Sequence, residues 1–290
     1  MRKFIKWTIR VITIIILLIL ICWIIFAQVG MKFRRSDADA KLEFSKENVQ
    51  LLTSTQSVNG RQIHYVATGK DSLPTIIFIH GSPGSWDAFA EYLKDKELLE
   101  KFRMISIDRP GFGYSDFGES ENLSTQSKLL SPLIESLLNG KPTYLVGHSL
   151  GGPMIIKLAA DNPGFFNGLV ILAGSMDPDL EEKESWRPIL NAFPLRYLAP
   201  GAMRPSNKEL WYLKKDLVDL KEDFGLIKCP VIIVHGNKDN MVPFANVDYT
   251  KKMLVNAANI QVKILEGSNH FIPWTRFNDI KQILLNLDSH

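Results

Sequence analysis

Residues 144–152 place a serine between an apolar run and a helical pattern, which limits the folds open to the chain. Residues 143–146 predict a buried strand, Ser149 follows within Gly-His-Ser-Leu-Gly, and residues 153–160 are rich in Ile, Leu and Ala. Gly-x-Ser-x-Gly between a strand and a helix is the signature of a nucleophile elbow. Only glycine leaves room beside so tight a turn, and the turn directs the unpaired N–H groups of the helix start at the serine. Ser149 is therefore a candidate nucleophile.

From residue 56 onward, strand patterns alternate with helical patterns. Residues 58–66 predict two strands joined by a turn at Asn59-Gly60, which is a strong signal for a hairpin. Continuous apolar runs are typical of strands that are buried on both faces. Such a run occupies residues 74–79. Further strand patterns occupy 103–107, 143–146, 168–173, 230–235 and 259–265, and helical patterns occupy 86–99, 124–138, 153–160 and 277–287. This alternation predicts an α/β fold with a mostly parallel, doubly wound sheet.

One interval, between Gly174 and Lys228, has no strand pattern. A structureless loop of roughly 50 residues is unusual in a compact domain. We therefore predict a small inserted helical cap at about 175–228, lying over the active site. The alternative is an insertion that only packs against the domain.

The N-terminal segment contains an uncharged apolar run at residues 11–27. With its apolar flanks, this run reaches the roughly 20 residues that cross a bilayer. The residues around Ala27 make a poor signal-peptidase site, and Cys22 lacks the small preceding residue of a lipoprotein signal. We therefore expect an uncleaved transmembrane anchor at 1–30, followed by a linker at 31–55.

Charge gives an expected orientation and excludes one class of partner. Four cations and the free amine precede the apolar run and three cations follow it, which favours a cytoplasmic N-terminus and a catalytic domain on the outer side. The net charge is only +3 and no other basic block is present, so we expect no nucleic-acid binding. The two cysteines do not identify a redox compartment.

Over residues 56–290 the chain resembles the α/β-hydrolase family. The family's motifs follow in its order: His-Gly-Ser-Pro-Gly at 80–84, Asp-Arg-Pro-Gly-Phe-Gly-Tyr-Ser at 108–115, the elbow, Gly-Asn-Lys-Asp at 236–239 and Glu-Gly-Ser-Asn-His-Phe at 266–271. The resemblance implies a triad of Ser149, Asp239 and His270. It also implies an oxyanion hole formed by the backbone N–H groups of Ser82 and Leu150.

Each implied role has a chemical reason. A serine hydroxyl is a weak nucleophile until a base takes its proton, and the imidazole of His270 titrates near neutral pH. The Asp239 carboxylate would hold the histidine tautomer. Asp177 is the rival acid, because some family members place it after the preceding strand. We expect His80 and His235 to be structural and His148 to pack with its side chain pointing away from the site, while His64 lies in the predicted hairpin.

The resulting hypothesis is a membrane-anchored serine hydrolase that cleaves a small-molecule carboxylic ester, with a lipid-like acyl ester as one possibility. Trp86, Trp186 and Trp274 are the candidate pocket residues. We expect no cofactor and no metal, since no phosphate loop or metal-ligand spacing occurs. The family's epoxide hydrolases and haloalkane dehalogenases use aspartate at the elbow, so Ser149 disfavours both.

Fold-level resemblance leaves several other functions open. Carbon–carbon bond hydrolases, cofactor-free peroxidases, peptidases and acyltransferases share the triad. A binding or receptor protein without turnover is the alternative from another class. The natural substrate and the oligomeric state are not predicted.

Overall fold

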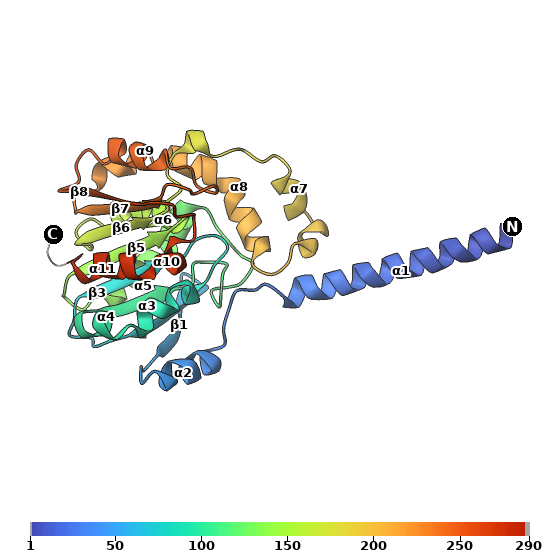
Figure 1. The fold of residues 1–290 in the computed structure, drawn as a ribbon, viewed down its shortest axis with the longest axis horizontal. Coiled ribbons are helices and arrows are strands. Elements are labelled where there is room, and N and C mark those ends of the chain that lie inside the picture. Colours follow the sequence, from blue (N-terminus) through green and yellow to red (C-terminus); the bar gives the residue numbers. More distant parts are fainter. Residues whose placement is uncertain (1, 288–290) are drawn as a thin grey trace.

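An eight-stranded sheet forms the centre of the molecule in the computed structural model, which describes residues 2–287 (Figure 1). The strand order is β1-β2-β4-β3-β5-β6-β7-β8. The pairs β1–β2 and β2–β4 are antiparallel, and all the other pairs are parallel. The strands are β1 (Leu52–Val58), β2 (Arg61–Thr68), β3 (Thr75–Ile79), β4 (Arg103–Ile107), β5 (Thr143–His148), β6 (Gly168–Leu172), β7 (Val231–Gly236) and β8 (Ile260–Leu265). The predicted mostly parallel α/β sheet is confirmed.

The hairpin of β1 and β2 turns at the two predicted residues. Val58 pairs with Arg61, which leaves Asn59 and Gly60 as a two-residue turn. Their φ angles are +50° and +79°, in the left-handed region that this kind of hairpin turn requires. The Asn-Gly sequence therefore sets the register of the first two strands.

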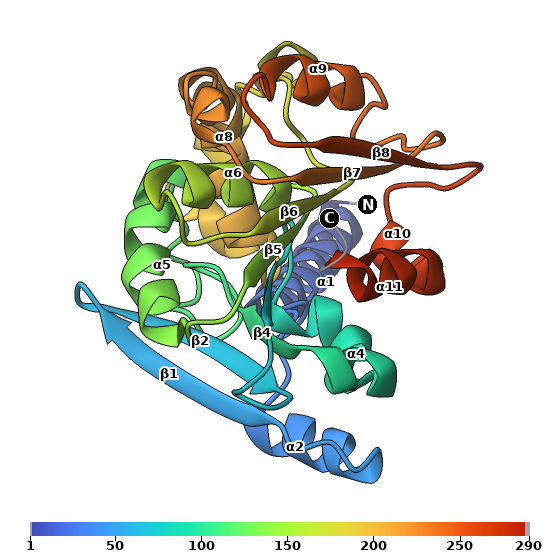
Figure 2. The ribbon, with the colours of Figure 1, turned by 90° about the vertical axis from the view of Figure 1, so that its left-hand side faces the viewer.

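Helices cover both faces of the sheet, as expected for a doubly wound fold. In Figure 2, α5 and α6 lie on one side of the strands, and α4 and α11 lie on the other. These helices and their neighbours are η1 (Trp86–Phe89), α3 (Ala90–Lys94), α4 (Lys96–Lys101), α5 (Leu123–Leu137), α6 (Gly151–Asp161), α9 (Asn246–Met253), α10 (Ile272–Thr275) and α11 (Phe277–Leu285).

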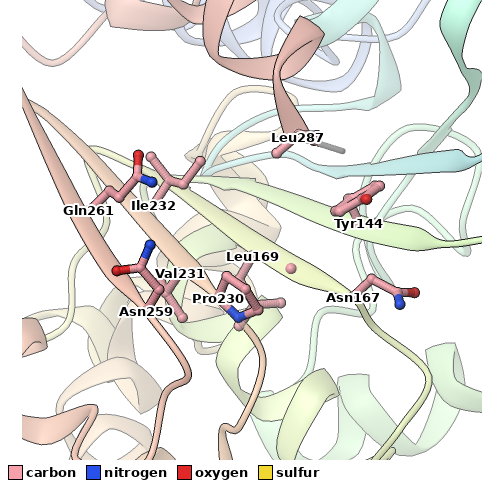
Figure 3. Close-up of a pocket in the computed structure, with 10 residues that line it drawn as sticks. Tyr144, Asn167, Leu169, Pro230, Val231, Ile232, Asn259, Gln261 and Leu287 are labelled. Carbon is pink, nitrogen blue, oxygen red and sulfur yellow. The ribbon is translucent and has the colours of Figure 1, made fainter. Parts of the chain in front are cut away.

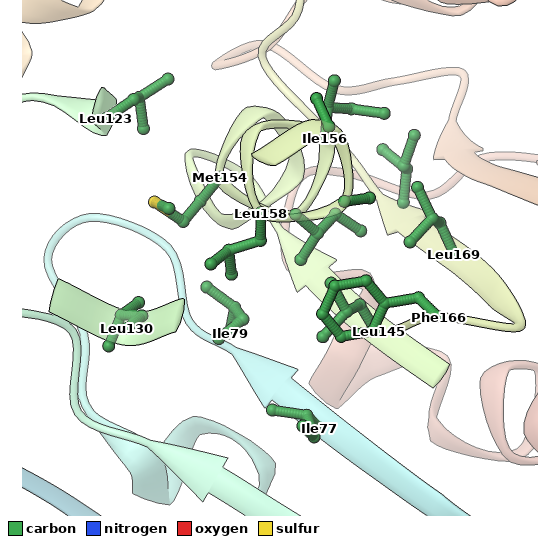
Figure 4. Packing of buried hydrophobic residues seen from close by; sticks show 14 of the residues in the cluster. Ile77, Ile79, Leu123, Leu130, Leu145, Met154, Ile156, Leu158, Phe166 and Leu169 are labelled. Carbon is green, nitrogen blue, oxygen red and sulfur yellow. The ribbon is translucent and has the colours of Figure 1, made fainter. Parts of the chain in front are cut away.

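Alternate side chains of the buried strands supply two separate cores. Ile77 and Leu145 pack with Met154 and Leu158 of α6 on one face (Figure 4). Phe78 and the other alternate residues face the second cluster, on the side of α3 and α11. Because both faces are buried, the strands read as continuous apolar runs rather than alternating ones.

The interval between β6 and β7 folds as the predicted helical insertion. It contains η2 (Pro178–Leu180), α7 (Arg187–Asn191), η3 (Leu195–Leu198), α8 (Met203–Asp219) and η4 (Asp223–Leu226). Leu213 and Leu217 of α8 are buried against the first core. We refer to residues 175–228 as the cap.

The N-terminal helix α1 (Arg2–Val29) projects from the body of the molecule (Figure 1). Its 28 residues are long and apolar enough to cross a membrane. Its last two turns contact the cap: Trp23 Nε1 donates to Leu198 O over 3.0 Å, and Gln28 Nε2 donates to Tyr197 O over 2.8 Å. The amide of Gly201 also donates to Ala27 O over 3.0 Å.

The segment that we predicted as a linker, residues 31–55, differs from that prediction. It contains the helix α2 (Asp37–Lys46), and β1 already begins within it. Ala40 and Phe44, four residues apart and so on one helix face, are fully buried in the second core. Burial of this face fixes the segment to the domain.

Candidate active site

Ser149 lies on a strained turn at the carboxyl end of β5. Its φ angle is +54°, which an L-residue rarely adopts. The flanking glycines are required by close backbone contacts. A Cβ on Gly147 would lie 2.2 Å from Gly151 O, and one on Gly151 would lie 2.3 Å from Ile79 O. The sequence motif therefore has the steric reason that we inferred for it.

The loop after β3 passes directly beside this serine. A Cβ on Gly81 would lie 2.9 Å from Ser149 Cβ, so glycine permits the approach. Among the described residues, the backbone N–H groups of Ser82 and Leu150 donate to no protein group. Two unpaired donors next to a candidate nucleophile are what an oxyanion requires.

His270 and Asp239 form a hydrogen-bonded pair at the same edge of the sheet. Asp239 follows β7, His270 follows β8, and His270 Nδ1 lies 2.7 Å from Asp239 Oδ2. The other carboxylate oxygen accepts the amides of Met241 and Val242 over 2.9 and 2.8 Å. Burial alone would raise the pKa of Asp239, but the hydrogen bond from His270 and these amides outweigh it and lower that pKa. Asp239 is thus held as the anion.

Ser149 and His270 line one cavity, and no hydrogen bond joins them in this state. Within the part of the chain that the structure describes, the Ser149 hydroxyl makes no hydrogen bond. Hydrogen bonds of catalytic groups are often long in unliganded enzymes and shorten when substrate binds. The candidate nucleophile and the candidate base therefore lie in one cavity, without a hydrogen bond between them.

The cavity has a volume of about 470 Å³ and a largely apolar wall. This volume lies within the range of roughly 300–1,000 Å³ that is usual for small-molecule sites. Its apolar lining includes Phe33, Met203, Met241, Phe271 and Trp274. Phe33 comes from the segment after α1, and Met203 begins α8, so this segment and the cap both contribute to the wall.

Two of the three predicted pocket tryptophans are placed elsewhere, whereas Trp274 lines the cavity. Trp86, the first residue of η1, is 1% exposed. It packs against Phe44 in the second core, which lies against the sheet. Trp186 is 48% exposed on the cap and stacks on Arg187. The predictions for Trp86 and Trp186 were wrong.

His148 is a cavity residue that the sequence analysis assigned to packing. Its Nε2 donates to the backbone carbonyl of His270 over 3.0 Å, and its ring lies edge-on to Trp274. Burial, followed by the neighbouring charge of His270, lowers the pKa of His148 to about 3. A neutral ring therefore supports the loop that carries His270, and the expectation that it points away was wrong.

A buried ion pair connects the cap to the loop beside Ser149. Arg109 and Glu209 make two hydrogen bonds of 2.7 and 2.9 Å, and their side chains are 0% and 2% exposed. The same guanidinium donates to the carbonyl oxygens of His80 and Gly81, both over 2.9 Å. Ser82 Oγ also donates to Ser206 Oγ of α8 over 2.8 Å.

These contacts were absent from the sequence predictions. Arg109 belongs to the motif at 108–115, but its partner lies 100 residues later with no motif around it. Helix periodicity on α8 was the available signal, since Leu213 and Leu217 are buried on the face that also carries Glu209.

The competing acids and histidines have other partners. The Asp177 carboxylate accepts the amide of Asp179 over 2.9 Å and caps η2. Asp108 accepts the amides of Trp86 and Tyr114 and bonds His64 Nδ1 over 2.8 Å. In the described residues, no group of three His, Cys, Asp or Glu side chains is arranged to hold a metal ion.

A second hollow, of about 260 Å³, lies at the amino ends of β5 to β8 (Figure 3). Its wall includes Tyr144, Asn167, Pro230, Asn259 and Leu287, and none of its lining residues is a serine, histidine or acid. Ligands of parallel α/β sheets bind outside the carboxyl ends of the strands. The candidate active site is therefore the cavity beside Ser149.

Comparison with known proteins agrees with this fold. The family model of the alpha/beta hydrolase fold matches residues 74–199. Epoxide hydrolase 1 of Caenorhabditis elegans is 31% identical over 112 residues, which is 38% of this chain and only 27% of that protein. A second curated relative, epoxide hydrolase 4 of Mus musculus, is likewise matched over 32% of its length. A non-heme chloroperoxidase of Kitasatospora aureofaciens is 25% identical over 261 residues, 74% of this chain and 90% of that protein.

Solved structures extend the similarity of fold to the whole chain. A membrane phospholipase A, described as a bacterial virulence factor, superposes with a TM-score of 0.61 at 15% identity and covers 100% of both chains. Other curated relatives are named esterases. The family match over residues 74–199 and the shared architecture show that the chain has the α/β-hydrolase fold.

Proposed function

We propose that the chain is a membrane-anchored serine hydrolase that cleaves a carboxylic ester through a triad of Ser149, His270 and Asp239. One observation carries this proposal. His270, which is hydrogen-bonded to Asp239, lines the same cavity as a serine held at φ +54°, beside two unpaired amides. A base, its orienting acid, a nucleophile and oxyanion donors are the parts that acyl transfer needs.

The proposed reaction follows from these positions. Ser149 Oγ attacks the ester carbonyl while its proton passes to His270 Nε2, and the Asp239 carboxylate stabilises the imidazolium. The amides of Ser82 and Leu150 hold the oxyanion, and loss of one such donor raises the barrier by about 3 kcal/mol. The imidazolium then protonates the departing alcohol. Water, deprotonated by His270, cleaves the acyl-enzyme and restores the serine.

The wall of the cavity supports a substrate with an apolar acyl group. Phe33, Met203 and Phe271 carry no charge that could bind a polar acyl group, and the wall as a whole is largely apolar. The helix α1 supports an anchored enzyme that meets substrates at a membrane. The same apolar wall makes a lipid-like ester the substrate class that we propose.

Labelling with a fluorophosphonate probe tests the nucleophile. Wild type and Ser45→Ala, which changes an exposed serine on α2, should label equally, whereas Ser149→Ala should not label. Equal labelling of Ser149→Ala would remove the proposed nucleophile. p-Nitrophenyl esters of increasing acyl length should show a rising kcat/KM. A flat or absent response would reject an apolar ester substrate and favour the carbon–carbon or peroxide chemistry named for relatives such as the chloroperoxidase.

The proposed anchor and its orientation have separate tests. Extraction of membranes with alkaline carbonate should leave the full chain in the pellet. Protease treatment of intact cells should digest the catalytic domain, since we propose that it lies on the outer side. Release by carbonate would refute the anchor, and a protected domain would refute the orientation.

A further inference from the structure

We propose that the exposed end of the cap, residues 186–196, lies in the lipid–water interface of the membrane that holds α1, so that the cavity opens onto that bilayer. This inference rests on the proposed anchor. We call residues 186–196 the cap tip. Its proposed partner is the headgroup and upper acyl region of an anionic bilayer.

The composition of the cap tip is that of an interfacial element. It exposes Trp186, Ile189, Phe193 and Leu195 by 48%, 63%, 82% and 39%. Residues 185–205 contain Arg187, Arg196 and Arg204 and no acidic residue, and of these arginines Arg187 pairs with Glu184 just before the cap tip. Aromatic and aliphatic side chains flanked by arginines are characteristic of segments that lie at an anionic membrane surface.

The contact between α1 and the cap fixes the depth of the cap tip. Trp23 and Ala27, which bond the cap at Leu198 and Gly201, lie inside the uncharged run of residues 11–27 and not beyond it. At 1.5 Å per residue that run is about 25 Å long, slightly shorter than a hydrocarbon core of about 30 Å. With Arg10 at one membrane surface, a core of about 30 Å takes up about 20 residues, so Trp23 and Ala27 lie in the half of the bilayer next to the cap.

The neighbouring residues of the cap must therefore meet the membrane surface. Leu198 accepts the Trp23 indole N–H and directly follows the cap tip in the chain. In Figure 1, α7 and the adjoining turn reach about as far along the direction of α1 as the carboxyl end of that helix, where it joins the body of the molecule. If they remained in water, the exposed side chains of the cap tip would form an apolar patch, which soluble proteins rarely leave uncovered.

The wall of the cavity adjoins the contact between α1 and the cap. The amide of Ala202 donates to Met31 O over 2.8 Å, which joins the segment after α1 to the start of α8. Phe33 lies two residues after Met31, and Met203 directly follows Ala202. Both line the cavity beside Ser149. An acyl chain could thus leave the bilayer and reach the serine along apolar side chains.

Depth-dependent quenching tests the location directly. The full chain, with Cys22 and Cys229 replaced by alanine, is labelled with NBD at Phe193→Cys and reconstituted in phosphatidylglycerol–phosphatidylcholine vesicles that carry doxyl lipids. Val255→Cys, exposed by 73% just before the amino end of β8, is the matched control. We expect at least fivefold stronger quenching at position 193 than at position 255.

The outcomes separate the two proposals. Equal quenching at both positions in carbonate-resistant protein would overturn the interfacial location and leave the anchor standing. Protein released by carbonate would overturn both. Protection of position 193 that persists in detergent and disappears on dilution would show that a second copy covers the cap tip, and would also overturn the proposal.

A kinetic split provides the second readout. Phe193→Asp should lower kcat/KM for a vesicle-borne long-chain ester at least tenfold and leave a soluble short-chain ester within twofold, while Val255→Asp should change neither. An equal loss on both esters, or no loss on the vesicle-borne ester, would reject the inference. If wild type cleaves no ester, the proposed function fails, and the quenching experiment still decides where the cap tip lies.

Discussion

Glu209→Gln is the sharpest test of the connection between the cap and the loop after β3, which lies beside Ser149. The substitution keeps the side-chain shape and removes the charge opposite Arg109. The guanidinium would remain fully buried, and an amide nitrogen would face its N–H groups where one carboxylate oxygen now accepts them. No other described acid bonds Arg109, whose remaining partners are carbonyl oxygens and the amide oxygen of Gln126.

The structure sets the size of the expected effect. Breaking a buried pair by removing one partner costs about 3–5 kcal/mol. For a domain of this size, each kcal/mol corresponds to about 2–4 °C in Tm, so the lower limit predicts a loss of roughly 6–12 °C. Because Arg109 also holds the Gly81 carbonyl, whose peptide continues to the proposed oxyanion donor, kcat should fall about 10- to 100-fold.

Thermal unfolding in detergent and esterase kinetics measure both effects. Glu97→Gln is the control, since Glu97 pairs with Lys281 over 2.6 Å at a side-chain exposure of 62%, and surface pairs contribute about 0–1 kcal/mol. The double variant Arg109→Met with Glu209→Met should recover much of the stability without the activity, because no unpaired charge remains. A Glu209→Gln protein with the Tm and kcat of Glu97→Gln would refute the reasoning.

Three further predictions concern the site and its support. Asp239→Asn should lower kcat about 10⁴-fold by favouring the wrong imidazole tautomer, whereas Asp177→Asn should change it less than twofold; similar losses in both variants would contradict the assignment of the acid. Burial lowers the pKa of His148 to about 3, so the unfolded chain takes up a proton below about pH 6.5 that the folded chain does not. The free energy of unfolding should therefore fall by about 1.4 kcal/mol per pH unit from this residue as the pH drops from 6.5 toward 4, and a Tm that stays constant over that range would disprove it. Gly151→Ala should destabilise the fold by about 1–3 kcal/mol, because its Cβ would meet Ile79 O. Gly225→Ala, whose Cβ meets nothing within 4 Å, should leave the urea midpoint unchanged. Equal midpoints for the two variants would count against the steric argument.

Local constraints explain which features could be predicted from the sequence. The turn at Asn59-Gly60 and the glycines around Ser149 obey steric rules that act within a few residues, so their patterns are diagnostic. The buried strands were recognisable because both faces of the sheet are covered. The cap was recognisable as an interval with no strand pattern.

The features that were missed depend on contacts between distant segments. A short helix at residues 39–44 could be suggested from the sequence, but not its burial, because Ala40 and Phe44 pack on strands that come later in the chain. The three tryptophans had equal chemistry in the sequence, and only tertiary packing separates buried Trp86 from exposed Trp186. The triad assignment remains a prediction for the probe and the variants to test.

The ion pair of Arg109 and Glu209 also decides how a substrate can enter. If the cap swung open as a lid, Glu209 would separate from Arg109 and the buried ion pair would be broken. At a cost of about 3 kcal/mol, an open form would occupy less than roughly one molecule in a hundred. We therefore expect the cap to stay in place while substrate reaches Ser149 through the cavity, whose wall includes Phe33 and Trp274.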